Sequence, residues 1–374
     1  MKLISVKITM SLILLIFVSF FQIKGLTGYK INIVKNPRPT CEEKLFTELV
    51  KTGEVSVNIE DENFLILPFE LAVSKEGNIF VFDSKQTKIF CYNKNLKLID
   101  IFSKHGRGPS ELGSRPHHAG AIFMEVGEDN NLYVGDRYNT AIHCFNSKGA
   151  FIKDIRLRTM GSPSIIPVMD MKGNFYSYSG FKGEKIIDVF NKNGEQITSL
   201  IDRKELGNCL YSEPIRKESK TRIFYSGPNT FLLQSTVDNR IVVYLSEPSA
   251  LFILKDYKIQ KKINLLPLNA LKEYKEKKEE ALKSDSTVTI FQSMITDKDN
   301  KNNFYLEYGV TKDKKRHLLY MFDYNGKLKQ VYYIKLLTKG IFHIKYKRNG
   351  IFYAIGTGED EEKTIITLKE AKEK

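Results

Sequence analysis

The residues best suited to catalysis or ligand binding lie in one stretch, HGRGPSELGSRPHHAG, from His105 to Gly120. It holds three of the chain's six histidines. Arginine and histidine side chains suit contacts with anions and glycan hydroxyls. One interpretation is therefore a ligand-binding loop. The alternative is a structured turn whose backbone is set by glycine and proline and whose histidines are solvated. The candidate ligand-binding residues here are His105, Arg107, Glu111, Arg115, His117 and His118, and the candidate turn residues are Gly106, Gly108 and Pro109.

A metal site is the third interpretation of the same stretch. Zinc needs three or four ligands that converge in a tetrahedron. The adjacent pair His117 and His118 suits this poorly because neighbouring side chains point apart, and the sequence has neither HExxH spacing nor a CxxC pair. We therefore expect no cofactor, and calcium or zinc is an unsupported alternative.

Two aspartates end apolar strand-like runs, Asp83 in VFD and Asp136 in VGD. Carboxylates at such positions either line a binding rim or accept hydrogen bonds that hold the following turn. We favour the turn for both. Arg137 and Tyr138, beside Asp136, are better candidates for ligand contact.

The elements that must position these residues form an internal repeat. Each unit reads as strand, turn, strand, turn, strand, turn, strand, with hairpin turns such as KEGN, EDNN and NSKG. An asparagine recurs at the first turn, at Asn78, Asn131, Asn174, Asn239, Asn303 and Asn349. Six units of four strands predict an all-β fold, a six-bladed β-propeller. The repeats span 71–102, 122–157 and 168–202, followed by weaker ones at 231–266, 289–336 and 340–370.

Closure of the ring is predicted from the two ends of the chain. The sixth unit has three strands, whereas EVSVNIE, from Glu54 to Glu60, is an unassigned strand. An open ring would expose bare sheet edges, so we expect this strand to complete the last blade as its outermost member; a loose N-terminal arm is the alternative. The expected organisation is a signal peptide at 1–25, an arm at 26–53, a propeller at 54–370 and a tail at 371–374, with blades at 65–104, 121–157, 165–202, 231–266, 289–336 and 340–370 plus 54–60.

The segments GNIFVFDSKQTKIFCYN, GRGPSEL and DNNLYVGDRYNTAIHCFNSKG together resemble the six-bladed β-propeller proteins common in Bacteroidetes-type bacteria, relatives of NHL-repeat propellers. In that family a GPGE-type loop follows the first blade, and here Ser110 stands where the family usually has glycine. The similarity covers roughly residues 65–202. The resemblance implies an exported propeller and brings no catalytic residues to this chain.

The meander topology predicts which face carries recognition. Blade-to-blade links and second-to-third turns share one face, and the longest links, at 105–120, 203–230 and 267–288, all belong to it. A predicted amphipathic helix at 269–284 would lie over this rim as an insertion, either as a lid or partner-docking helix or as a solvated decoration.

Export is indicated by the N-terminus, because the apolar run from Ile8 to Phe21 is shorter than the ~20 residues that span a bilayer. The alternative is that the run is an uncleaved membrane anchor. We expect no lipid-anchor site, and membrane association only through this segment. The formal net charge is +14, but lysine outnumbers arginine, which disfavours nucleic-acid binding. Cys91 and Cys144 occupy equivalent places in neighbouring repeats, too far apart for a disulfide, so we expect two separate buried thiols. We expect a monomer.

Three functional classes remain. The first is a non-catalytic binding protein that presents its loop-rich face to a glycan, a peptide or a protein partner. The second is a metal-dependent propeller hydrolase or lyase, and the third is a purely structural component. The enzyme would need polar residues near the axis. The innermost strands offer Glu70, Glu125, Gln234, Gln292 and His343, and these are not expected to align in register.

Overall fold

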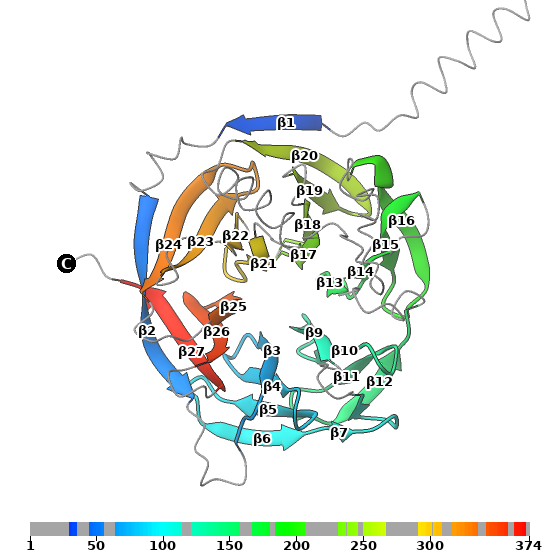
Figure 1. Cartoon of the computed structure of the whole chain (residues 1–374). Helices are drawn as coiled ribbons and strands as arrows, with labels where there is room; N and C mark the ends of the chain where they lie inside the picture. Colours follow the sequence, from blue (N-terminus) through cyan, green and yellow to red (C-terminus); the bar gives the residue numbers. More distant parts are fainter. Residues whose placement is uncertain are drawn as a thin grey trace, which may run out of the picture.

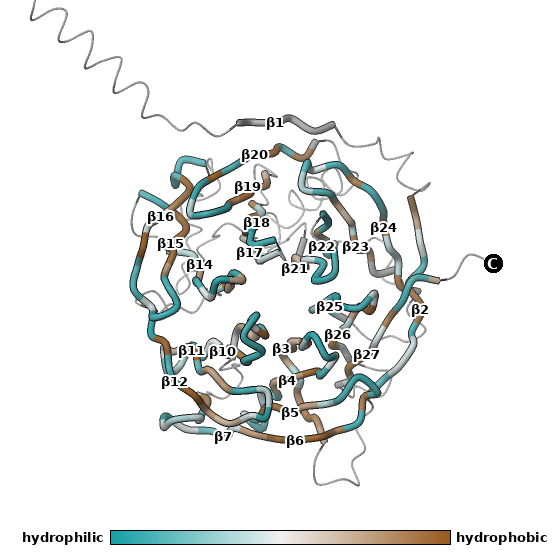
Figure 2. The backbone as a smooth tube through the Cα atoms, turned by 180° about the vertical axis from the view of Figure 1, so that it is seen from behind, coloured by the Kyte–Doolittle hydropathy of each residue, from teal (hydrophilic) through white to brown (hydrophobic). Residues whose placement is uncertain are grey.

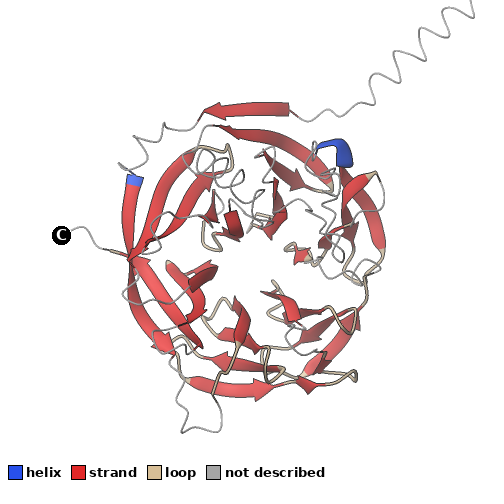
Figure 3. Cartoon of the chain, viewed as in Figure 1, coloured by secondary structure: helices blue, strands red, loops and turns tan. Residues whose placement is uncertain are grey.

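The computed structural model describes residues 30–35, 45–55, 64–113, 121–157, 167–179, 184–205, 231–236, 238–245, 250–266, 291–300, 302–308, 316–335, 342–357 and 363–371. Most of these residues lie in β-strands, which turns and short links join (Figure 3). The expected signal peptide, the expected helix at 269–284, Cys41 and Cys209 lie outside them. Within the described part of the chain, no helix is long and apolar enough to cross a membrane.

Small antiparallel sheets make up the molecule, and three of them have four strands in sequence order. The first contains β3 (Pro68–Val73), β4 (Ile79–Asp83), β5 (Lys88–Tyr92) and β6 (Leu98–Phe102). The second contains β9 (Ala121–Val126), β10 (Leu132–Asp136), β11 (Ala141–Phe145) and β12 (Phe151–Ile155). The third contains β13 (Val168–Met169), β14 (Phe175–Tyr178), β15 (Lys185–Phe190) and β16 (Gln196–Asp202).

The remaining strands form two larger sheets and one small one. A five-stranded sheet contains β17 (Phe231–Ser235), β18 (Arg240–Leu245), β19 (Ala250–Lys255), β20 (Lys258–Leu266) and, parallel to β20 at its outer edge, β1 (Lys30–Lys35). An eight-stranded sheet contains β21 (Phe291–Thr296), β22 (Asn303–Tyr308), β23 (Arg316–Asp323), β24 (Leu328–Lys335), β2 (Phe46–Val55), β27 (Lys363–Glu370), β26 (Ile351–Thr357) and β25 (Phe342–Arg348) in that spatial order. β7 (Lys104–His105) and β8 (Glu111–Leu112) form a parallel pair.

The sheets stand around one central axis, as in a β-propeller (Figure 1). The innermost strands contact one another in cyclic order, from β3 through β9, β13, β17, β21 and β25 and back to β3. The first strand of each antiparallel run therefore faces the axis, and the last strand lies on the outer wall. Residues brought to the axis come from all parts of the sequence.

β2 joins the two halves of the eight-stranded sheet. Its first half pairs in parallel with β24, from Phe46 to Leu49, and its second half pairs antiparallel with β27, from Leu49 to Val55. The strand expected over Glu54–Glu60 therefore lies earlier in the sequence: only its first two residues belong to β2, and 56–60 are outside the described residues. The segment expected as an arm, 26–53, supplies β1 and most of β2.

The hairpin chemistry of the repeat sets the turns. Gly77, Gly173 and Gly194 have φ of +90°, +80° and +87°, and Asn239 and Asn349 also have positive φ, a conformation that glycine and asparagine tolerate best. At the first turn of the second sheet, the Gly127 amide donates to the Asn131 carbonyl at 2.9 Å. These tight turns place strands that are consecutive in the sequence side by side in the sheet.

The core lies between neighbouring sheets, and Figure 2 shows apolar residues distributed around the whole ring. Phe80 and Phe82 of the first sheet, for example, pack in one cluster with Met124, Val134 and Phe145 of the second. The thiols of Cys91 and Cys144 are free and buried, which confirms the sequence-based expectation of two separate thiols. Burial raises the pKa of each to about 11.

Candidate functional site

The link that follows the first sheet folds back on itself. The Glu111 carboxylate accepts a hydrogen bond from the Gly108 amide at 2.8 Å, and the Glu111 amide donates to the Gly108 carbonyl at 3.0 Å. A side chain on Gly106 would collide with the Glu111 carboxyl. The hydrogen bond from Gly108, together with Lys104 at 3.2 Å, holds the pKa of Glu111 below its usual value. Glu111 thus shapes the turn through its own carboxylate.

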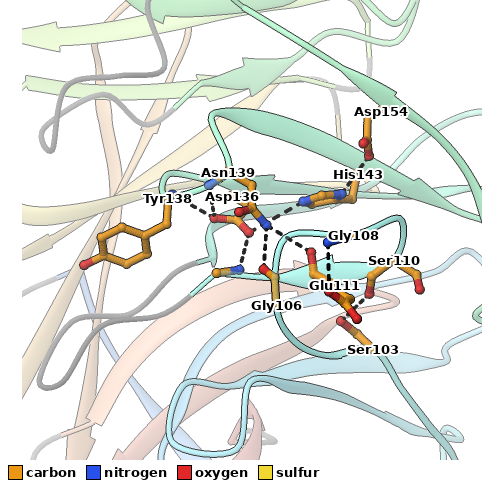
Figure 4. A network of polar contacts seen from close by, with 11 residues as sticks. Ser103, Gly106, Gly108, Ser110, Glu111, Asp136, Tyr138, Asn139, His143 and Asp154 are labelled. Carbon is orange, nitrogen blue, oxygen red and sulfur yellow. Dashed lines mark hydrogen bonds and ion pairs between the residues drawn. The ribbon is translucent and has the colours of Figure 1, made fainter.

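Asn139 and Asp136, from the turn after β10 and the end of β10 in the second sheet, hold this link in place through hydrogen bonds (Figure 4). The side-chain amide of Asn139 donates to the carbonyl oxygens of Gly106 and Glu111, each at 3.1 Å. The Asp136 carboxylate accepts from the backbone amides of Gly113 and of Tyr138. The link and the turn after β10 therefore form one rigid polar unit, to which we refer as the rim platform (residues 103–113 and 136–139).

His143 lies beneath the rim platform and was not singled out by its sequence context, IHCF, which reads as a buried strand. Its side chain is 2% exposed, and the ring lies between two carboxylates, with Nδ1 2.7 Å from Asp154 and Nε2 3.5 Å from Asp136. Burial opposes protonation of the imidazole, but the two aspartates prevail and raise the pKa of His143.

The structure places the candidate ligand-binding residues unevenly. His105 and Arg107 are exposed on the rim platform. Arg137 and Tyr138 follow Asp136 on the adjoining turn, with the guanidinium 5.1 Å from the centre of the tyrosine ring. Arg115, His117 and His118 lie outside the described residues.

The two aspartates bind backbone. Asp83 accepts hydrogen bonds from the amides of Leu67, Lys85 and Gln86 at 2.8 to 2.9 Å. Asp136 likewise accepts from the amides of Tyr138 and Asn139, at 2.8 and 3.1 Å. Both carboxylates are completely buried. Neither is therefore available to a ligand at the surface.

A second group of polar residues lines a cavity of about 80 Å³ at the axis. Glu70 on β3, Glu125 on β9 and Gln234 on β17 all face it, although the sequence pattern indicated that they are out of register. Glu70 follows a register shift in β3, so strand alternation does not predict its direction. Gln292 carries no described side chain, and His343 lies 3.8 Å from Glu307 instead.

Two lysines that the sequence reasoning missed neutralise the axial carboxylates. Lys298 lies 3.0 Å from Glu125 and Lys345 lies 3.2 Å from Glu70. The Tyr346 hydroxyl, which is buried, donates to Glu125 at 2.8 Å; burial, reinforced by that carboxylate, raises the pKa of Tyr346 well above its usual value. Among the described residues, no three His, Cys, Asp or Glu side chains converge as a metal site would require.

The ring of small antiparallel sheets defines the chain as a β-propeller, and comparison with solved structures agrees. A member of the DUF4221 family from Bacteroides vulgatus matches with a TM-score of 0.55 and 14% identity, and the match covers 87% of this chain and 99% of that one. A protein of Bacteroides fragilis named as a candidate exported protein matches with a TM-score of 0.55 and 12% identity, covering 92% of this chain and 100% of that one. At such identities the similarity shows the fold alone.

Virginiamycin B lyase from Staphylococcus aureus also matches, covering 86% of this chain and 99% of that one at 10% identity, with a TM-score of 0.46. No family model matches the sequence, and no curated protein does.

Proposed function

We propose that the chain is an exported, six-bladed β-propeller that binds a glycan, peptide or protein partner on its loop-rich face without catalysing a reaction. The count of six rests on treating the eight-stranded sheet as two blades, β21–β24 and β25–β27 with β2. The cyclic contacts of the six inner strands support this division. Export is supported by the N-terminal apolar run and by the similarity to a Bacteroides fragilis protein that is itself described as exported.

The observation that carries the binding role is the rim platform. Hydrogen bonds donated by Asn139 and accepted by Asp136 fix its backbone, so that the exposed side chains of His105 and Arg107 project from a rigid base. A fixed base lowers the entropy lost when a partner docks. Loops held by a rigid scaffold are the usual location of recognition residues.

The inner carboxylates favour binding over metal-dependent hydrolysis. Glu70 and Glu125 each have a lysine ammonium as their partner. A lysine that pairs with a carboxylate competes for the oxygens that a divalent cation would need.

The test is a glycan array combined with affinity capture from the exporting cell, using the purified chain and a His105→Ala/Arg107→Ala variant. The proposal expects the double variant to lose at least tenfold in affinity for the captured glycan or protein while its melting temperature stays unchanged. The control is Lys148→Ala, which removes an exposed cation from a hairpin turn at the opposite end of the strands. Equal binding by all three proteins would refute the proposed rim site.

A further inference from the structure

The axial cavity has a polar wall that stability does not explain. The Glu125–Lys298 pair has side chains only 11% and 9% exposed, and the Glu70–Lys345 pair only 19% and 25%. Withdrawing such charges from water costs several kcal/mol per ion, and apolar residues of similar volume often stabilise a fold as well or better. The two ion pairs therefore call for an explanation in terms of a ligand.

The space is large enough for one. At roughly 10–15 Å³ of such space per water, a cavity of about 80 Å³ holds about five to eight waters, or a polyol the size of a single sugar ring. Its lining combines the charged groups with the amide of Gln234 and the aromatic side chains of Phe123 and Tyr346.

The charges that line the cavity favour a ligand without net charge. Two carboxylates and two ammonium groups sum to zero, so that an added anion or cation would leave one buried charge uncompensated. A hydroxyl avoids this cost, since it donates to a carboxylate and accepts from an ammonium group at the same time. A neutral molecule with several adjacent hydroxyls can therefore bridge each ion pair without breaking the charge balance.

The neighbouring segment adds an apolar surface. Phe69 is 42% exposed, and the Lys345 ammonium lies 5.6 Å from the centre of its ring, while the same lysine pairs with Glu70. A sugar ring has hydroxyls at its edge and an apolar C–H face. The cavity lining offers the charged groups to the hydroxyls and the Phe123 ring to the C–H face.

We propose that the axial cavity binds one neutral sugar residue, whose hydroxyls bridge Glu70 to Lys345 and Glu125 to Lys298. This site is separate from the rim platform. Its residues are not those changed in the rim variant, so that either proposal can fail while the other stands.

Isothermal titration calorimetry tests the proposal with D-glucose, D-galactose, D-mannose and N-acetyl-D-glucosamine as neutral probes, and with acetate and glycine as an anion and a zwitterion. We expect at least one sugar to bind with a Kd on the order of 1 mM or lower, and neither acetate nor glycine to bind. The key variant is Glu70→Gln/Lys345→Met, which removes both members of a pair and leaves no buried charge alone. It should weaken sugar binding at least tenfold.

The matched control is Lys75→Met/Glu128→Gln, which makes the same chemical change at an exposed ion pair of 2.6 Å and should leave sugar binding unchanged. If the axial double variant fails to fold, Gln234→Ala provides the second measurement and should also weaken binding. Absence of binding by all four sugars, stronger binding of glycine or acetate, or unchanged sugar affinity in a folded axial variant would each overturn the proposal.

Discussion

Replacing Leu49 with alanine should destabilise the ring at the seam, by which we mean β2 and its pairing with β24 and β27. Leu49 is the residue at which β2 passes from β24 to β27, and its backbone pairs with both Ile334 and Glu370. Its side chain is 2% exposed and packs in a cluster with Ile334 and Leu368, which belong to the two strands that β2 joins.

The magnitude follows from burial. A buried leucine cut to alanine costs about 2–5 kcal/mol, and more where the surroundings cannot collapse into the space. Domains are stable by only ~5–15 kcal/mol, so the loss is a large fraction of the total. Val50, the next residue, points the other way and is 37% exposed, so that Val50→Ala should change the free energy of unfolding by less than about 0.5 kcal/mol.

Urea unfolding followed by far-ultraviolet circular dichroism suits this comparison, because the chain has no tryptophan. The expected result is a lower urea midpoint for Leu49→Ala and an unchanged midpoint for Val50→Ala. If the two variants unfold at the same urea concentration, β2 does not hold the ring together and the account of its closure is wrong.

Three further expectations concern single groups. The pKa of His143 is raised in the folded state, so protonated His143 stabilises the fold fully below its unfolded pKa of about 6.5, and this contribution is lost as the pH rises through the folded-state pKa. The urea midpoint of the wild type should therefore fall as the pH is raised, and the midpoint of His143→Gln should change less with pH. Gly194→Ala should destabilise more than Gly350→Ala, because both have positive φ but only at Gly194 would the new methyl meet a backbone carbonyl oxygen; melting temperatures in the reverse order would contradict this. With pKa values of about 11, Cys91 and Cys144 are only about one thousandth thiolate at pH 8, so iodoacetamide should label them in urea and hardly at all in the native protein, as mass spectrometry would detect.

The strand repeat was readable because each strand obeys local rules. Turns such as KEGN require positive φ at defined positions, and alternating β-branched and aromatic residues mark the strands between them. β2 escaped the same reasoning. Its sequence, FTELVKTGEV, is less regular than EVSVNIE, and its position is set by pairing with strands about 285 to 321 residues away. Local pattern carries no information about such a partner.

The axial site was missed for a related reason. Glu70 and Glu125 could be assigned to inner strands, but their partners Lys345 and Lys298 come from the other end of the chain. A lysine in a sequence with 58 basic residues gives no signal that it will be buried. His143 was equally silent, since a histidine between apolar neighbours looks the same whether or not two carboxylates flank it.

The seam formed by β2 also governs the order of biogenesis. A polypeptide emerges from the ribosome N-terminus first, so Phe46–Val55 is synthesised long before Lys363–Glu370, its antiparallel partner. Until the final strand is made, an edge that ends up paired on both sides stays open to any other chain. Assembly therefore cannot finish until Lys363–Glu370 has been made, and a nascent molecule stalled before residue 363 would be a target for chaperones and would tend to aggregate.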